Sequence, residues 1–123
     1  MAALAAGQYT VATDGTHIAT DGVKRYVALL TQTGTDAPVA TVLTNTLSGP
    51  IVWTYNDVGS YTGTLTGAFT ADKTLTCSGV TRTGRFWELS RETVNSVTLT
   101  AITAGGDPVE LNATISAEIR VFP

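Results

Sequence analysis

Apolar and polar residues alternate with a period of two along much of this 123-residue chain. In the clearest segment, residues 114–121, four polar residues alternate with four apolar ones, Ile115, Ala117, Ile119 and Val121. This period is typical of a β-strand with one buried and one solvated face. Residues 97–101 repeat the pattern, and the glycines and proline of 104–108 lie between the two segments. We therefore expect these segments to form a hairpin with a long loop.

Threonine supplies 24 of the 123 residues. Its β-branched side chain suits a pleated sheet, and threonine pairs across strands contribute a few tenths to about 1 kcal/mol each. A buried hydroxyl without a partner costs about 1–3 kcal/mol, so most threonines should lie on solvated faces. Such faces can be buried against another subunit without dehydrating a charge. The composition therefore favours a sheet scaffold with contact surfaces.

Other short segments have strand character and are separated by turn residues. We expect strands at 8–12, 17–19, 26–30, 39–43, 51–55, 61–65, 73–77 and 86–89. Residues 26–30 are apolar on both faces, which predicts a central strand covered on both sides. No stretch shows helical spacing over three turns. The prediction is an all-β fold, an antiparallel β-sandwich of about 8–10 short strands, with the jelly-roll type as one option and a closed barrel as the second choice.

The length fits one domain with one core. The small apolar residues 1–7 predict a flexible N-terminal arm, and residues 8–123 a single β-sandwich domain. Cys77 is the only cysteine, so the chain has no internal disulfide and no cysteine cage for zinc. This favours assembly in a reducing cytosol. The alternation around Cys77 predicts a small, buried apolar residue.

The charges are few and scattered. The net charge is -3, and the one group of basic residues, Arg82, Arg85 and Arg91, is a weak candidate for phosphate recognition. Since phosphate recognition usually needs a clustered positive surface, we expect no nucleic-acid partner. No apolar run approaches the roughly 20 residues of a membrane span, so we expect no membrane insertion.

Groups that could carry catalysis are also few. His17 is the only histidine and lies in a turn-like segment with Asp14 and Asp21. We interpret it as a surface residue, while a catalytic role or a calcium site without the regular twelve-residue spacing stays an alternative. We expect no enzyme activity, no cofactor and no metal site. A small hydrolase would need His17 with an acid, or two acids, in one cleft; the available glutamates are Glu88, Glu92, Glu110 and Glu118.

The aromatic residues are the remaining candidates for a binding face. Trp53 and Tyr55 share one face of a predicted strand with Ile51, and Trp87 lies in another strand. If these faces point inward, the rings form the core or a subunit interface, which is the favoured interpretation. If they point outward, Trp53, Tyr55 and Trp87 could stack on a sugar, together with Tyr61 and Phe86.

One part of the chain resembles a known group of proteins. Residues 26–47 (YVALLTQTGTDAPVATVLTNTL), followed by IVWTY at 51–55 and GTLTGAFT at 63–70, are similar to small β-rich proteins of tailed bacteriophages and prophages. The resemblance covers residues 23–76 and contains no catalytic motif. It implies a non-enzymatic virion structural protein, either a capsid decoration protein or a head or tail fibre component.

The resemblance also implies where the protein would act and with what. It would belong to the virion and be assembled in the cytoplasm of the bacterial host. Its partners would be other copies of itself, most simply as a homotrimer, and major capsid or tail proteins. The alternative is a carbohydrate-binding β-sandwich module that adheres to a glycan of the host surface.

Overall fold

The computed structural model describes residues 9–11, 17–19 and 22–123, with side chains described for 22–123. These residues form eleven strands and no helix. The two strands of the expected opening hairpin are confirmed, since β1 (Tyr9–Val11) pairs antiparallel with β2 (His17–Ala19). The predicted turn at 14–15 and the predicted arm of residues 1–7 lie outside the described residues.

Two antiparallel sheets form the rest of the fold. One has the order β4-β3-β11-β7 and the other the order β5-β6-β10-β9-β8. The first contains β3 (Lys24–Gln32), β4 (Val39–Asn45), β7 (Thr74–Leu75) and β11 (Ala113–Val121). The second contains β5 (Val52–Asp57), β6 (Ser60–Thr64), β8 (Ser78–Val80), β9 (Phe86–Thr93) and β10 (Ser96–Ile102).

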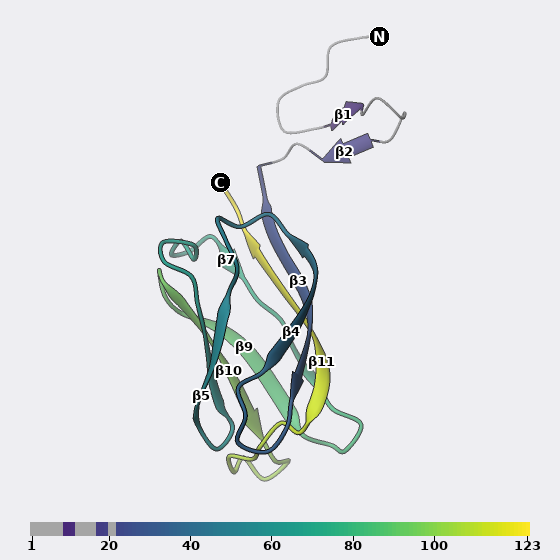
Figure 1. Cartoon of the computed structure of the whole chain (residues 1–123), viewed down its shortest axis with the longest axis vertical. Helices are drawn as coiled ribbons and strands as arrows, with labels where there is room; N and C mark the ends of the chain where they lie inside the picture. The colour runs from purple at the N-terminus through teal and green to yellow at the C-terminus, as the bar shows by residue number, and fades with distance from the viewer. Residues whose placement is uncertain (1–8, 12–16, 20–21) are drawn as a thin grey trace.

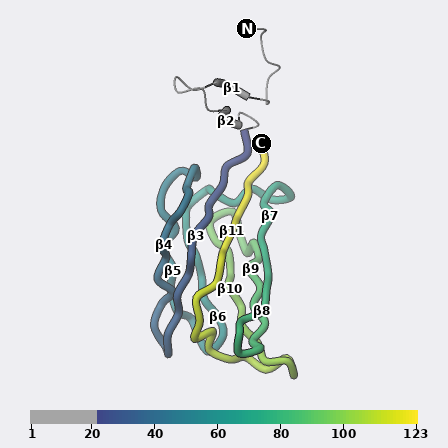
Figure 2. The backbone as a smooth tube through the Cα atoms, turned by 90° about the vertical axis from the view of Figure 1, so that its right-hand side faces the viewer, coloured from purple at the N-terminus to yellow at the C-terminus, as the bar shows by residue number. Residues whose placement is uncertain are grey.

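The two sheets lie face to face, as Figure 1 shows. Figure 2 shows β4 and β5 along one flank of the sandwich and β7 and β8 along the other. Neither sheet closes on itself, because each ends in two edge strands. The antiparallel β-sandwich is therefore confirmed in preference to the barrel.

The alternation predicted from the sequence decides which side chains enter the core. Four apolar residues of β11, at positions 115, 117, 119 and 121, are buried, and so are the alternate residues Val97, Leu99 and Ala101 of β10. The inner face of β3 contributes Tyr26, Ala28 and Leu30, each fully buried. None of the threonines in residues 22–123 is buried. The expectation that threonine coats the solvated faces is confirmed for this part of the chain.

The predicted hairpin between residues 97–101 and 114–121 is wrong. β10 pairs with β6 and β9, whereas β11 pairs with β3 and β7 in the other sheet. Beyond a single bridge between Ile102 and Pro108, the chain crosses the end of the sandwich. There Leu111 is buried, and its N–H donates to the Tyr61 hydroxyl at 3.0 Å. Both segments bury one face, and they do so from opposite sides of the same core.

The prediction that residues 26–30 are covered on both sides is also wrong. β3 is an inner strand of its sheet, but its outer face carries Val27, which is half-buried, and Leu29, which is 37% exposed. A sandwich of two layers covers only one face of each sheet. The apolar residues on the outer face of β3 therefore remain accessible.

Gln32 is the one buried polar residue of the described chain, with 1% of its surface exposed. Its Nε2 donates to the carbonyl oxygens of Gly34 at 2.7 Å and Asp36 at 3.1 Å, and its Oε1 accepts from the Asn112 N–H at 2.9 Å. The Asn112 side chain accepts from the Gly34 N–H at 2.7 Å. A buried amide with its hydrogen bonds made is tolerated. This network fastens the turn after β3 to the crossover before β11.

We predict that Gln32→Leu lowers the free energy of unfolding by about 1–3 kcal/mol, because it leaves backbone groups of Gly34, Asp36 and Asn112 without their partner. Urea unfolding followed by tryptophan fluorescence measures the change. Thr33→Ala, at the exposed neighbouring position, is the control and should stay within about 0.5 kcal/mol of the native protein. Equal losses in the two variants would contradict this role of Gln32.

Candidate functional site

Both tryptophans lie on the inner face of the five-stranded sheet, and each is 8% exposed. Each indole covers a glycine of a paired strand. A Cβ atom at Gly63 would lie 2.9 Å from Trp53 Cζ3, and one at Gly79 would lie 2.9 Å from Trp87 Cζ2. The Trp53 Nε1 also donates to the Tyr26 hydroxyl of the opposite sheet at 3.3 Å. This burial favours the core interpretation and counts against sugar stacking on either indole.

Tyr55, the third aromatic candidate, is half-buried. It packs edge to face against Tyr61, with ring centroids 5.8 Å apart. Burial and the adjacent Glu110 carboxylate raise the pKa of Tyr55. Glu110 in turn accepts a hydrogen bond from the Gly59 N–H at 3.0 Å. The ring of Tyr55 therefore extends the core toward this end of the sandwich, and no aromatic triad of Trp53, Tyr55 and Trp87 faces solvent.

The glutamates are distributed over different surfaces. Glu118 forms an ion pair with Arg120 at 2.7 Å on the outer face of the four-stranded sheet. Glu92 accepts from the Thr98 hydroxyl at 2.9 Å on the outer face of the other sheet. Glu88 is exposed on that same face, and Glu110 lies in the crossover between the sheets. Each of three hollows on the described part of the chain is lined by at most one carboxylate side chain.

The described residues contain no cluster of three His, Cys, Asp or Glu side chains that could hold a metal ion. This finding does not cover the predicted group of His17, Asp14 and Asp21, because their side chains lie outside the part of the chain that the structure describes. No helix of the described chain is long and apolar enough to cross a membrane.

The arginines proposed as a weak phosphate site have structural partners. Arg85 donates to the carbonyl of Leu111 at 3.2 Å, and Arg91 donates to the carbonyl of Phe69 at 2.7 Å. Both side chains thus hold crossing segments of backbone in place. Only Arg82 is exposed among the three.

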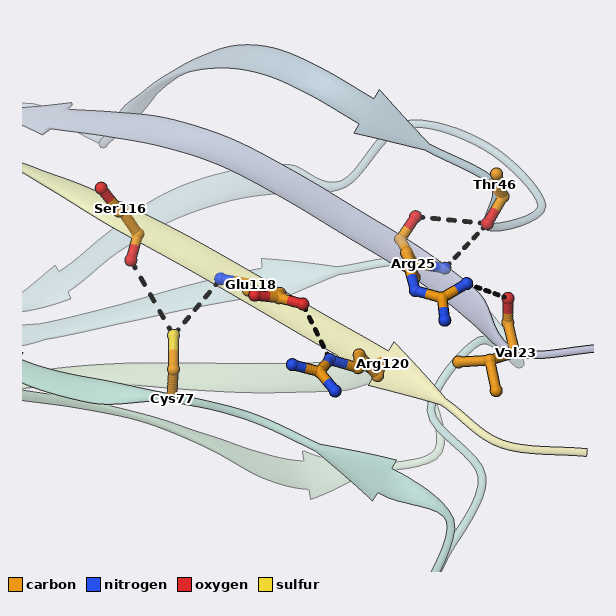
Figure 3. A network of polar contacts seen from close by, with 7 residues as sticks. All are labelled: Val23, Arg25, Thr46, Cys77, Ser116, Glu118 and Arg120. Atoms are coloured by element: carbon orange, nitrogen blue, oxygen red, sulfur yellow. Dashed lines mark hydrogen bonds and ion pairs between the residues drawn. The ribbon is translucent and has the colours of Figure 1, made fainter. Parts of the chain in front are cut away.

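Cys77 lies where the chain passes from one sheet to the other (Figure 3). Its Sγ accepts from the Glu118 N–H at 3.3 Å and contacts the carbonyl of Ser116 at 3.9 Å, both on β11. Its own carbonyl accepts from the Leu89 N–H of β9 at 2.9 Å. Burial raises the pKa of the thiol. Cys77 is half-buried, and its hydrogen bonds link the two sheets.

The most distinctive surface of the sandwich is its β4 flank, which consists of β4 and the outward-facing residues Val27, Leu29 and Thr31 of β3. β4 pairs on one side only and contains no charged residue among its seven. Val39 is 68% exposed, Leu43 is 61% exposed and Val42 is 48% exposed. The edge strands of the opposite flank are much shorter, with two residues in β7 and three in β8. Long uncharged edge strands are prone to associate.

Sequence reasoning predicted the β4 strand but not its position at an edge. The resemblance covered these residues without assigning them a role. The signal in the sequence is the absence of charge between Ala37 and Tyr55. No protein-family model, curated protein or solved structure matches the chain.

We predict that Gly63→Ala and Gly79→Ala each lower the free energy of unfolding by about 1–3 kcal/mol, because the added methyl group forces the indole out of its position. Gly49→Ala is the matched control, since a Cβ there meets Leu65 at an ordinary 3.6 Å. Thermal unfolding with near-ultraviolet circular dichroism measures both stability and indole packing. Unchanged stability in the two core variants would show that the tryptophans do not lie against these glycines.

We also predict a loss of stability in alkali. Burial raises the pKa of Cys77 above its ordinary 9.0 and those of Tyr26 and Tyr61 above 10.0. The unfolded chain therefore loses these protons first, so the stabilisation is complete below about pH 9 and decreases as the pH rises further. Urea midpoints measured from pH 7 to 11 test this. Cys77→Ala should delay the onset of the loss by about one pH unit; an unchanged profile would contradict the contribution of the thiol.

Proposed function

We propose that this protein is a non-enzymatic structural component of a tailed-bacteriophage virion, either a capsid decoration protein or a component of a head or tail fibre, and that it acts through protein–protein assembly. The resemblance of residues 23–76 supports the class. The β-sandwich with threonine-coated outer faces supports a scaffold role, because such faces can enter a contact without dehydrating charge.

The observation that carries the proposal is the β4 flank. Its seven-residue edge strand offers unpaired backbone groups to a neighbouring chain, and its exposed apolar side chains are Val39, Val42 and Leu43. Fully burying such a side chain stabilises a contact by about 1.5–3 kcal/mol. The outer face of β3 continues the same surface with Val27, Leu29 and Thr31. A stable interface buries roughly 800 Å² per partner, so the edge and the face together would form the central part of such a contact.

The proposed partners are other copies of the chain and a major capsid or tail protein. A structural protein used in many copies is commonly held in a closed symmetric unit, and we propose a homotrimer. The protein would be assembled in the cytoplasm of the bacterial host and be part of the virion. The β4 flank then serves one of two contacts, between copies or with the capsid or tail protein.

Sedimentation of the full chain, alone and with purified phage capsids and tails, tests the proposal. We expect a trimer at micromolar concentration, or co-sedimentation with one of the phage structures. Leu43→Lys should weaken the contact at least tenfold, because it places a charge in the interface. The control is Leu75→Lys, because Leu75 lies on the opposite flank and its side chain is 55% exposed. A strict monomer at high concentration that binds neither capsids nor tails would overturn the proposal.

A further inference from the structure

The outer face of the five-stranded sheet carries a hollow of about 460 Å³ at its β8 end. Two rows of side chains line it, and each row crosses β10, β9 and β8 in register. The first row is apolar and consists of Ile102, Phe86 and Val80. The second row is polar and consists of Thr100, Glu88 and Ser78. Two residues along a strand separate the rows, a distance of about 7 Å.

Phe86 is the central side chain of the apolar row and is 46% exposed. In residues 22–123 only Phe86 and Phe122 are exposed aromatic residues. Val80, on the edge strand beside Phe86, is 58% exposed, and Ile102 on the other side is half-buried. The row thus offers an accessible aromatic ring with an aliphatic side chain on each side.

The polar row offers hydrogen-bonding groups that the described chain itself does not use. The side chains of Thr100, Glu88 and Ser78 are exposed and make no hydrogen bond or ion pair with other described residues. A carboxylate flanked by two hydroxyls can accept and donate several hydrogen bonds at once. Hydrogen bonds to the carboxylate are the stronger, charge-assisted kind.

We propose that this hollow is a saccharide-binding site for neutral pyranosides. A pyranose has an apolar face of C–H groups and a rim of hydroxyls. The apolar row fits the C–H face, with Phe86 beneath the ring, while Glu88, Ser78 and Thr100 bind the hydroxyl rim. Small-ligand sites generally combine an apolar surface with a few placed polar groups. The carboxylate of Glu88 disfavours acidic sugars because like charges repel.

The position of Glu88 favours a sugar over a protein as the occupant. The centres of protein interfaces are depleted of charged residues. No Lys or Arg side chain lines the described hollow, so a protein seated there would have to bring its own cation to Glu88. Sugar hydroxyls can hydrogen-bond the carboxylate while leaving part of it in water. The site is separate from the β4 flank, since β8 lies along the opposite flank (Figure 2).

Nuclear magnetic resonance titration of the full chain with maltotriose, cellotriose and tri-N-acetylchitotriose tests the proposal. We expect at least one of these neutral trisaccharides to shift the amide resonances of residues 78–80, 86–88 and 100–102. Trigalacturonic acid should bind at least tenfold more weakly, because of Glu88. Absence of shifts at these residues with all three neutral sugars would overturn the proposal.

Variants assign the binding to the hollow. Phe86→Ala should weaken sugar binding at least tenfold, and Glu88→Gln should weaken it about threefold. Phe86→Tyr should retain binding, and this result would also show that the site tolerates substitution without unfolding. Val52→Ala, 59% exposed on the same sheet face at the opposite edge, is the matched control. If Phe86→Ala changes the sedimenting mass and leaves sugar binding unaltered, the hollow is a protein contact and the proposal is wrong. Because the titration uses the isolated chain, its outcome is independent of capsid or tail binding.

Discussion

Each sheet of this protein can bury only one of its two faces, because two sheets packed about 10 Å apart share a single interior. That interior is filled from both sides by alternate residues, and a hydrogen bond inside it joins Trp53 of one sheet to Tyr26 of the other. Glycines make room for the largest side chains, Gly63 beneath Trp53 and Gly79 near Trp87. Every apolar side chain on an outer face therefore lies outside this interior and is available for contact.

The same two-layer constraint explains where the polar anchors are. Backbone that passes from one sheet to the other leaves the ladder of strand hydrogen bonds, and its buried N–H and C=O groups need other partners. Gln32 and the Tyr61 hydroxyl provide them at the crossover of residues 109–112. Between β7 and β8, the Cys77 sulfur accepts a hydrogen bond from the Glu118 N–H of β11, and the Cys77 carbonyl accepts one from the Leu89 N–H of β9. Gln32 and Tyr61 thus support one end of the sandwich, and Cys77 supports its β7–β8 flank.

The outer surface is not uniform, and its differences suggest a division of roles. The β4 flank combines an open strand edge with apolar side chains and no charge, which suits a lasting contact with another chain. The Phe86 hollow combines an exposed ring with a carboxylate and hydroxyls, which suits a small polar ligand. The two surfaces lie on opposite flanks, so a chain held in an assembly by β4 would keep the hollow accessible (Figure 2).

Most of the strands and the direction of their side chains follow from the amino-acid sequence, but β8 (Ser78–Val80) was not predicted, and the strand expected at 73–77 is limited to β7 (Thr74–Leu75). The alternation assigned Ile115 and Ile119 to a buried face and threonine to the solvated faces, and both assignments hold within residues 22–123. The pairing of the strands, the identity of the edge strands and the exposure of the outer faces depend instead on how the two sheets pack. The expected hairpin of residues 97–101 and 114–121 failed for this reason. An alternation with a period of two shows that a strand has one buried face, but it does not show which strand lies beside it. Backbone hydrogen bonds can form equally well with any neighbouring strand, so the choice of partner depends on how the whole core packs.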